Sequence, residues 1–569
     1  MRKERNMKYL TTEFEKETEI TWISEHPDPQ FKRETWISLC GSWSLWIKVN
    51  RLSYSEKITL PFPPESRISN IRRSLKKGDD YTYVKTFSLP ESFKNKRAIL
   101  HFEAVDQIAE VYLNNSPLGK HIGGYTPFSF DITDHTEDVN CLKVIVKDDL
   151  DKNIPYGKQC RKRGGMWYTP VSGIWQSVWI EAVPKVHIEK FKIHPSLTSL
   201  DLEVFGGENE KKIIIDGVGE YSFTGEKTVI DIPDPEFWTP ERPKLYNFTL
   251  ICGEDKIESY FALRTVGIEK RNGIPYITLN GKPYFFHGLL DQGYFADGIY
   301  TPASPVGYIK DIQTAKTLGF NMLRKHIKTE PKLFYYYCDK YGMVVFQDMI
   351  NNGRYNFILD TALPTVGIKR FLCRPASKKR KRHFENTSKE IIEMLYNHPS
   401  VCYYTIFNEG WGQYEANRLY REFKTLDPAR VIDSVSGWFK TAKNDVKSEH
   451  IYFRKLKLTS HKKKPLVLSE FGGYSCKIKE HSFNLNKNYG YKFFNDTEEL
   501  TNALDDLYHN ELIPLIDKGL CASVLTQLSD VEDETNGLMT YDRRVIKPDI
   551  KVMQDIANEI YGKFKKITE

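Results

Sequence analysis

Two glutamates, each at the end of an apolar run, are the residues of this chain whose setting most clearly suggests chemistry. Glu409 follows the run VCYYTIF and an asparagine, and Glu470 follows the run LVLS further along the chain. A glutamate is seldom buried without a partner. Two carboxyl groups that face each other can break a glycosidic bond, because one protonates the leaving oxygen while the other attacks the sugar carbon or activates water. For each glutamate taken singly, the competing interpretation is a strand-end residue in a salt bridge or a helix cap.

The residues around Glu409 add further groups that a sugar site needs. Asn408 is an amide beside the acid and can donate to the hydroxyl next to the reacting carbon; the alternative is a strand-end cap. Trp411 offers a flat face for stacking, with core packing as its alternative, and Gln413 offers further polar contacts. Together these neighbours favour a binding site around Glu409 over an isolated structural carboxylate.

From about Ile268 onward, short apolar runs alternate with segments of helical periodicity, which predicts βα units with parallel strands. About 300 residues and roughly eight strands fit a (β/α)8 barrel better than an open sheet, so residues 268–569 are expected to form one. Chemistry in such a barrel lies at the carboxyl ends of the strands, where both glutamates fall. The expected strands include 320–326, 343–349, 400–410, 430–437, 450–453, 465–473 and 522–530, and the expected helices are 305–319, 330–342 and 388–399.

The part of the chain before the barrel has the pattern of two β-sandwiches. Short alternating runs separated by Asn, Gly, Pro and Asp predict a jelly-roll domain over residues 1–184. A second block of five or so strands predicts an immunoglobulin-like sandwich over residues 185–267. The expected strands of the first block are 81–89, 98–105, 109–115, 141–148 and 177–183.

Charge and composition exclude nucleic acid as the main partner. The chain is 40% hydrophobic and 28% charged, and its net charge of +7 is a slight excess for its size. The densest basic stretch, residues 377–384, is expected to be a solvated loop or the start of a helix. No basic stripe with interleaved aromatic residues accompanies it, as nucleic-acid binding would require.

The cysteines and the apolar segments predict a soluble cytoplasmic protein. The nine cysteines contain no CxxC pair, which favours reduced thiols over a disulfide framework or a zinc site. The first residues lack the apolar core of a secretory signal, and no apolar run approaches the ~20 residues that span a bilayer. We therefore expect no membrane partner.

The segments around both glutamates resemble those of glycoside hydrolase family 2, the group of β-galactosidases, β-glucuronidases and β-mannosidases. NHPSVCYYTIFNEGWGQ is similar to the acid/base signature of the family, and LVLSEFGG is similar to its nucleophile segment. LNGKPYFFHG, LGFNMLRKHI and CDKYGMVVFQDM resemble its first three barrel segments in order. FWTPERPKLY and FALRTVG resemble its immunoglobulin-like domain, and FEAVDQIAEVYLNNSPLGKHIGGYTPFSFDIT and SGIWQSVWIE its jelly roll. The resemblance spans essentially the whole chain.

This resemblance implies roles for the residues that match the motifs. Glu409 is expected to be the general acid/base, and Glu470 the nucleophile of a retaining reaction with a covalent glycosyl-enzyme intermediate. In such a reaction the two carboxyl groups lie about 5–5.5 Å apart. Glu409 should start protonated and Glu470 ionised, and glycosylation of Glu470 should then suit Glu409 to act as base. Asn408 is expected to contact the 2-hydroxyl, and Tyr452 to donate a hydrogen bond to the nucleophile.

Three residues on expected strands are further candidates for the site. His450 precedes Tyr452 by two positions and therefore shares its strand face, so it is expected either to contact the substrate or to be a packed, hydrogen-bonded histidine. Arg324 and His326 share a face in the same way. We expect Arg324 to be a structural cation beneath the carboxylates and His326 to be a residue of the binding site.

Two acids and one tryptophan complete the set of candidates. Asp348 ends an expected strand and is predicted to hold a sugar hydroxyl, with a metal ion as the weaker alternative. Asp291 follows the first barrel strand, where a sugar contact and a loop cap are about equally favoured. Trp438 is a stacking face or a core residue. The sequence contains no cluster of His and carboxylates that would complete a metal site, so no metal and no cofactor are predicted.

The last strand is followed by TQLSDVEDETNGLMTYDRR (526–544), which bears on the choice of sugar. Glucuronide-specific members of the resembled family have Asn-x-Lys here to bind the sugar carboxylate, whereas this chain has Glu-Thr-Asn before the glycine and no lysine. The five acids of this loop would also repel an anionic sugar. A neutral sugar is therefore preferred, and β-galactoside is the commonest neutral choice in that family.

The sequence thus predicts a retaining exo-β-glycosidase, with β-galactosidase as the first choice of activity. The alternative within the same class is a β-glucuronidase or another β-glycosidase. The alternative from a different class is a non-catalytic carbohydrate-binding protein, against which the presence of both glutamates in order argues. A homo-oligomer is possible, but nothing in the sequence demands one.

Overall fold

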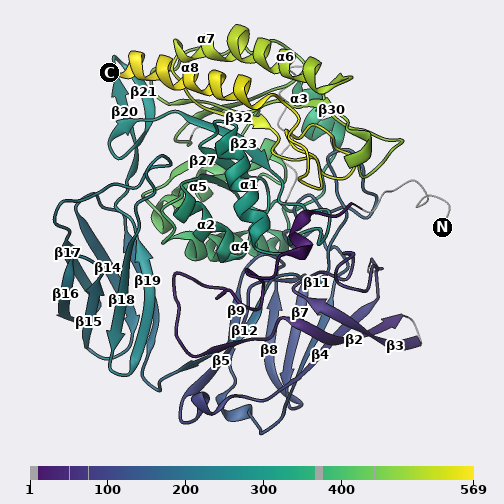
Figure 1. The fold of residues 1–569 in the computed structure, drawn as a ribbon, viewed down its shortest axis with the longest axis vertical. Helices are drawn as coiled ribbons and strands as arrows, with labels where there is room; N and C mark the ends of the chain where they lie inside the picture. The colour runs from purple at the N-terminus through teal and green to yellow at the C-terminus, as the bar shows by residue number, and fades with distance from the viewer. Residues whose placement is uncertain (1–9, 50–51, 75, 366–375, 440–442) are drawn as a thin grey trace.

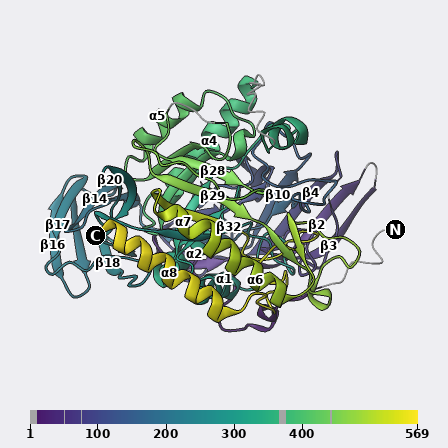
Figure 2. The same ribbon diagram turned by 90° about the horizontal axis from the view of Figure 1, so that it is seen from above.

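The computed structural model of the chain describes residues 10–49, 52–74, 76–365, 376–439 and 443–569 (Figure 1). Two groups of β-strands lie at the bottom of the view in Figure 1, and a barrel of strands and helices lies above them. Figure 2 shows the same parts from above, with the C-terminal helix α8 (Ile550–Thr568) along the outside of the barrel. Among the described residues, no helix is both long enough and apolar enough to cross a membrane.

The first group of strands is a two-layered sandwich. One layer has the order β3 (Leu52–Leu60), β2 (Gly41–Val49), β4 (Asp80–Phe87), β10 (Asn140–Lys147), β7 (Ile108–Leu113) and β8 (Ser116–Ile122). The other layer has the order β1 (Trp36–Ser38), β12 (Val178–Val183), β5 (Arg97–Phe102) and β9 (Phe128–Asp131). A short pair, β6 (Val105–Asp106) with β11 (Gly173–Ile174), joins them. Alternate residues of both layers, such as Leu45 and Leu100, point into one shared core, as the period-two pattern predicted.

The second group of strands is a smaller sandwich of two antiparallel sheets. One sheet has the order β13 (Ile188–His194), β14 (Ser199–Gly206) and β17 (Lys227–Asp231). The other has the order β16 (Gly219–Thr224), β15 (Glu210–Ile215), β18 (Tyr246–Cys252) and β19 (Asp255–Phe261). Apolar residues of both sheets again form one core. The two expected β-sandwiches are therefore present, while their boundaries at residues 184 and 267 stay predictions.

The remaining chain forms the expected barrel of eight parallel strands, which is nearly closed. A small sheet of β20 (Val266–Arg271), β21 (Ile274–Leu279) and β22 (Lys282–Pro283) leads into it. The strands of the barrel pair in the order β27-β26-β25-β24-β23-β32-β29-β28. Within the described residues no backbone pairing joins β27 to β28. The strands are β23 (Phe286–Asp291), β24 (Met322–Lys325), β25 (Val344–Asp348), β26 (Val401–Phe407), β27 (Val431–Val435), β28 (Lys447–Ile451), β29 (Leu466–Gly472) and β32 (Leu520–Thr526). Five of the expected strand runs from 320 onward contain one of these strands, and the runs 450–453 and 522–530 overlap β28 and β32 in part.

Helices cover the outside of the barrel. They are α1 (Val306–Thr317), α2 (Lys332–Tyr341), α3 (Leu363–Thr365), α4 (Lys378–Leu395), α5 (Ala416–Leu426), α6 (Thr497–Leu507), α7 (Ile513–Ile516) and α8, with a short pair β30 (Tyr474–Cys476) and β31 (Lys492–Phe494). Helix α2 ends at Gly342, whose φ of 72° is the left-handed conformation expected of a C-terminal glycine. The helix expected over 388–399 begins earlier than predicted, because the Ser377 side chain accepts a hydrogen bond from Arg380 N and caps α4.

The basic stretch 377–384 is thus a helix start, one of the two structures expected of it. It is not wholly solvated, since Arg380 is buried and donates a hydrogen bond to Gly412 O. Eight of the nine cysteines lie in the described residues and all eight are free thiols, as the sequence predicted; Cys373 lies outside them.

Candidate active site

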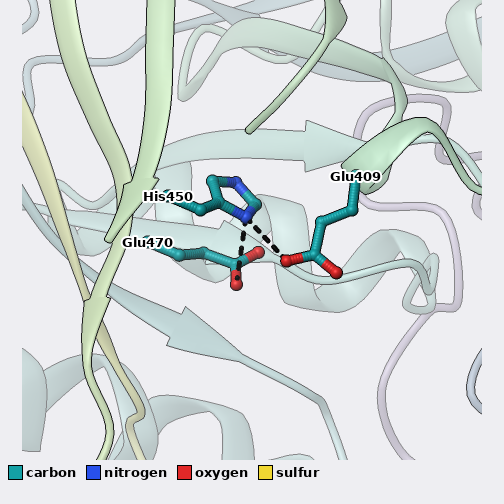
Figure 3. Close-up of side chains that lie close together, drawn as sticks. All are labelled: Glu409, His450 and Glu470. Carbon is teal, nitrogen blue, oxygen red and sulfur yellow. Dashed lines mark hydrogen bonds and ion pairs between the residues drawn. The ribbon is translucent and has the colours of Figure 1, made fainter. Parts of the chain in front are cut away.

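Glu409 and Glu470 meet at the carboxyl ends of two barrel strands. Glu409 lies in the single turn Asn408–Gly410 that follows β26, and Glu470 lies near the end of β29. Three atoms lie within 4.8 Å of one another: one carboxylate oxygen of each glutamate and a ring nitrogen of His450 (Figure 3). This separation fits the close pair of a retaining glycosidase and is too short for the wider gap, about 6.5–9.5 Å, of an inverting one.

Glu470 is held as a buried carboxylate. Its Oε1 accepts a hydrogen bond of 3.0 Å from Arg324, and its Oε2 accepts one of 2.7 Å from the Tyr452 hydroxyl. Burial alone would raise the pKa of Glu470, but the positive charge of Arg324 and the hydrogen bond from Tyr452 hold it below its usual value. Glu470 is therefore ionised at neutral pH, as a nucleophile must be. Tyr452 makes the hydrogen bond that the sequence predicted for it.

Glu409 has a strained backbone and a side chain that is partly exposed. Its φ and ψ of 53° and 23° lie in the left-handed region, which is costly for a residue other than glycine and is found most often at functional sites. The next residue, Gly410, also has positive φ, and a Cβ there would lie 2.3 Å from the Phe439 ring. The turn thus depends on glycine at this position and directs the Glu409 side chain to His450, whose Nδ1 lies 3.0 Å from Glu409 Oε1.

Arg324 connects Glu470 with two other candidate residues. Its guanidinium donates to Asp348 Oδ1 at 3.0 Å and to Asn408 Oδ1 at 3.0 Å. Ser436 also donates to Asn408 Oδ1. Because Oδ1 is occupied in this way, the Nδ2 group of Asn408 is the part left to donate to a ligand, as its expected role requires. Arg324 is the buried structural cation that the sequence predicted.

His326 and Asp348 lie behind the glutamates as a hydrogen-bonded pair. Burial lowers the pKa of His326 to about 4, so its ring is neutral near pH 7 and donates from Nδ1 to Asp348 Oδ2 at 2.8 Å. Burial would raise the pKa of Asp348, but the charge of Arg324 lowers it below its usual value. Both oxygens of Asp348 accept hydrogen bonds from the protein. The sequence predicted that Asp348 binds a sugar hydroxyl. That role stays a prediction, and these contacts within the protein do not favour it.

Asp291 and His450 also have their polar atoms engaged by the protein. Asp291 accepts hydrogen bonds from Gly293 N and from Lys325 Nζ, at 2.8 and 2.6 Å, which is the loop-cap alternative for this residue. His450 has a side chain with 0% exposure and contacts both glutamates. Of the two interpretations given for His450, the packed and hydrogen-bonded one describes its position.

The aromatic candidates form a wall rather than an open platform. Trp411 is buried, donates from Nε1 to Gly353 O, and meets the Trp167 ring edge-on at 5.3 Å. Trp438 is buried against the His450 ring at 5.7 Å. Gln413 is buried as well. Its Oε1 lies so close to Gly410 that a Cβ added to this glycine would contact it. Core packing, the alternative for both tryptophans, thus accounts for most of their surface.

Residues from the first β-sandwich reach this wall, which the sequence did not predict. Trp167 packs against Trp411 and against Tyr355, whose centroid lies 4.9 Å from its own. Burial raises the pKa of Tyr355 above its usual value and the charge of Glu409 adds to the effect, which places this wall beside the acid. The aromatic pair Trp167 and Tyr168 in GMWYTP was the only sign of this contribution in the sequence. Nothing in the sequence connects that pair to a barrel strand.

The five acids of the loop 526–544 are buried, and each has a hydrogen-bonding or ionic partner. Glu532 and Asp533 both lie within ion-pair distance of Arg163, which comes from the first β-sandwich. Glu534 accepts hydrogen bonds from the Tyr168 hydroxyl and from an asparagine of its own loop. The other two pairs are Asp530 with Lys547 and Asp542 with His481. These partners weaken the expected repulsion of an anionic sugar by this loop, which stays a prediction.

Two family models match the chain. Residues 271–560 match "Glycosyl hydrolases family 2, TIM barrel domain", and residues 52–185 match "Glycosyl hydrolase 2 galactose-binding domain-like". The first match alone covers more than half of the sequence.

Curated relatives and solved structures agree with these matches. A β-galactosidase of Thermoanaerobacter pseudethanolicus is 25% identical over 458 residues, which cover 72% of this chain and 56% of the relative. A putative β-glucuronidase of Formosa agariphila is 25% identical over 58% of this chain and 39% of the relative. The chain thus spans about half the length, or less, of these two curated relatives. The structure of a β-D-glucuronidase from Dictyoglomus thermophilum superimposes with a TM-score of 0.74 at 19% identity, covering 95% of this chain and 98% of that one, and shows the same fold.

Proposed function

We propose that this chain, which belongs to glycosyl hydrolase family 2, is a retaining exo-β-glycosidase. The observation that carries the proposal is the close pair of Glu409 and Glu470, whose oxygens lie within 4.8 Å. In the first step, ionised Glu470 attacks the anomeric carbon while Glu409 protonates the departing oxygen. In the second step, Glu409 removes a proton from water, which displaces Glu470 and leaves the sugar with its original configuration.

The surroundings of the two glutamates support these opposite roles. Glu470 is ionised, and hydrogen bonds from Arg324 and Tyr452 hold both of its oxygens in place. Glu409 is partly exposed and lies beside the negative charge of Glu470. Glycosylation removes that charge, so Glu409 is then suited to act as base.

Within this reaction, we propose a terminal β-galactoside as the sugar. The absence of a lysine from the loop 526–544 supports a neutral sugar. A β-glucuronide is the second candidate, and one observation favours it: four of the five acids of this loop lie against Arg163, Lys547 or His481, which weakens their repulsion of a sugar carboxylate. The different-class alternative, a non-catalytic carbohydrate-binding protein, predicts binding without turnover.

The test compares p-nitrophenyl β-galactoside, β-glucuronide, β-mannoside and α-arabinoside with one enzyme preparation. We expect the highest kcat/KM for the galactoside, and NMR of the first-formed sugar should show the β-anomer. Glu470→Gln should lower kcat by about 10⁴-fold or more, because it removes the nucleophile. Glu498→Gln, the same change at an exposed position of α6, is the control and should leave kcat unchanged.

Two results would count against the proposal at different levels. A higher kcat/KM for another sugar would overturn the choice of galactoside and leave the reaction in place. Turnover by Glu470→Gln at the wild-type rate, or a first-formed α-anomer, would overturn the retaining mechanism.

A further inference from the structure

His450 lies between the two glutamates, and its contacts define the position of its ring proton. Its Nδ1 is 3.0 Å from Glu409 Oε1 and 3.5 Å from Glu470 Oε2, as Figure 3 shows. Its Nε2 is 3.5 Å from a guanidinium nitrogen of Arg324. These are the three charged groups that face the imidazole, and the ring is enclosed by Trp438 and by Gly437, where a Cβ would lie 3.2 Å from the ring.

The arginine determines the tautomer of this histidine. A guanidinium has only donors and stays protonated, so Nε2 must present its lone pair to Arg324. The proton of the neutral ring therefore lies on Nδ1, which faces the two carboxylates. From there the Nδ1–H donates to Glu409 Oε1 at 3.0 Å, while Glu470 Oε2 lies 3.5 Å from Nδ1.

We propose that His450 is a positioning residue that keeps the catalytic proton of Glu409 on Oε2 and stabilises the Glu409 carboxylate that forms in the first step. The inference rests on the proposed retaining reaction. Oε1 of Glu409 is occupied as an acceptor, so the acid proton occupies Oε2, and Oε2 is the atom that protonates the leaving group.

The transfer of charge in the first step gives this hydrogen bond its second role. The bond from the anomeric carbon to the leaving oxygen breaks, a bond from Glu470 to that carbon forms, and the proton of Glu409 Oε2 goes to the leaving oxygen. Glu470 becomes a neutral ester, and Glu409 becomes the carboxylate. The hydrogen bond from His450 Nδ1 to Glu409 Oε1 then becomes stronger, because hydrogen bonds to charged acceptors are stronger than those to neutral ones. His450 itself neither gains nor loses a proton.

A matched pair of substitutions separates the donor from the shape of the side chain. Asparagine can donate from a position near that of Nδ1, whereas leucine has a similar shape and no donor, so we compare His450→Asn with His450→Leu. Each is tested on the sugar that the wild type hydrolyses best, as a phenyl glycoside, whose departure needs the acid, and as a 2,4-dinitrophenyl glycoside, whose departure does not.

We expect His450→Leu to lower kcat/KM ~100-fold for the phenyl glycoside and less than ~10-fold for the dinitrophenyl glycoside. His450→Asn should remain within ~10-fold of the wild type for both. A merely structural role of His450 would lower both substrates equally. Equal losses for the two leaving groups, or equal losses for the two variants, would therefore overturn the proposal.

A second measurement does not depend on activity. Nitrogen-15 NMR of the histidine-labelled protein, with the His450→Asn spectrum as the assignment, should show a ring that is protonated on Nδ1 and not on Nε2. A signal from an Nε2–H tautomer would overturn the inference. Wild-type protein that shows the Nδ1–H tautomer but hydrolyses no glycoside would instead contradict the proposed function.

Discussion

Arg324 supplies the positive charge that allows several acids to be buried together at the barrel mouth. It hydrogen-bonds to Glu470, Asp348 and Asn408 at once, and its side chain is 1% exposed. Burial alone would lower the pKa of this arginine, but the Asp348 and Glu470 carboxylates raise it above its usual value. An ionised carboxylate without such a partner would be very costly in this environment. The cation thus keeps Glu470 both charged and fixed in direction.

Tyr452 also holds Glu470 in its ionised form, so the proposed activity should have a pH profile that is sensitive to this hydroxyl. Its hydrogen bond stabilises the ionised carboxylate and lowers the pKa of Glu470. Tyr452→Phe should raise the pKa of Glu470. On acidification, the ionised form of Glu470 that attacks the sugar is then lost at a higher pH. We expect the acidic limb of the kcat/KM profile to move up by about one pH unit, the effect of a hydrogen bond to a charged group.

Tyr561→Phe removes a hydroxyl that donates to Gly319 O from helix α8 and serves as the control, with no change in that limb. An acidic limb at the same pH in Tyr452→Phe and in the wild type would show that the hydroxyl does not tune the nucleophile.

At the scale of elements, the barrel mouth is completed by a segment of the first β-sandwich. Residues 157–169 bring Trp167 and Tyr168 to the site, where Trp167 packs on Trp411 and Tyr168 donates to Glu534. The first β-sandwich thus contributes side chains to the aromatic wall at the barrel mouth.

Trp167→Ala should weaken substrate binding more than it slows the chemical step. The side chain forms part of the aromatic wall but does not contact Glu409 or Glu470, and one lost aromatic contact corresponds to about 1 kcal/mol. We expect KM to rise by roughly tenfold with kcat within about threefold of wild type. Trp46→Ala, at a 48% exposed position on β2, is the control and should change neither constant. A fall in kcat with an unchanged KM would assign Trp167 to the reaction step instead.

At the scale of the whole molecule, Arg33 joins the two β-sandwiches. Its side chain is buried and binds Asp255 of the second sandwich through two hydrogen bonds of 2.8 and 2.9 Å. It also contacts Glu181 of the first sandwich at 3.1 Å and donates to Ile188 O. One cation therefore pairs with two buried acids from different parts of the chain.

Arg33→Met should destabilise the protein strongly, since it leaves Asp255 buried without its cation. It also removes one of the partners of Glu181, which keeps its contact with His101. The expected loss in the free energy of unfolding is about 3–5 kcal/mol. Arg97→Met is the control: it removes a pair with Asp131 whose side chains are more than a third exposed, for which a loss below about 1 kcal/mol is expected. Both are measured by urea unfolding followed by tryptophan fluorescence. Equal stabilities of the two variants would show that the buried pair contributes no more than a surface pair.

The sequence by itself determined the architecture and the two glutamates. Strand and helix periods are local properties, and the carboxyl ends of parallel strands must share one side of a barrel, so Glu409 and Glu470 could be placed at one mouth before any contact was known. The place of Arg324 followed from its strand position, whereas the hydrogen bond of Tyr452 to Glu470 was implied by the family resemblance; the structure has both contacts.

The tertiary structure alone decided which groups compensate one another. His450 appeared on its strand as one candidate among several, yet its place between both glutamates depends on Gly437 and Arg324 from other strands. The acids of the loop 526–544 looked like free charge, but their partners are distant in sequence, as Arg163 shows. Periodicity determines where a side chain lies on its own element, whereas pairing between charges depends on distances that only the folded chain establishes.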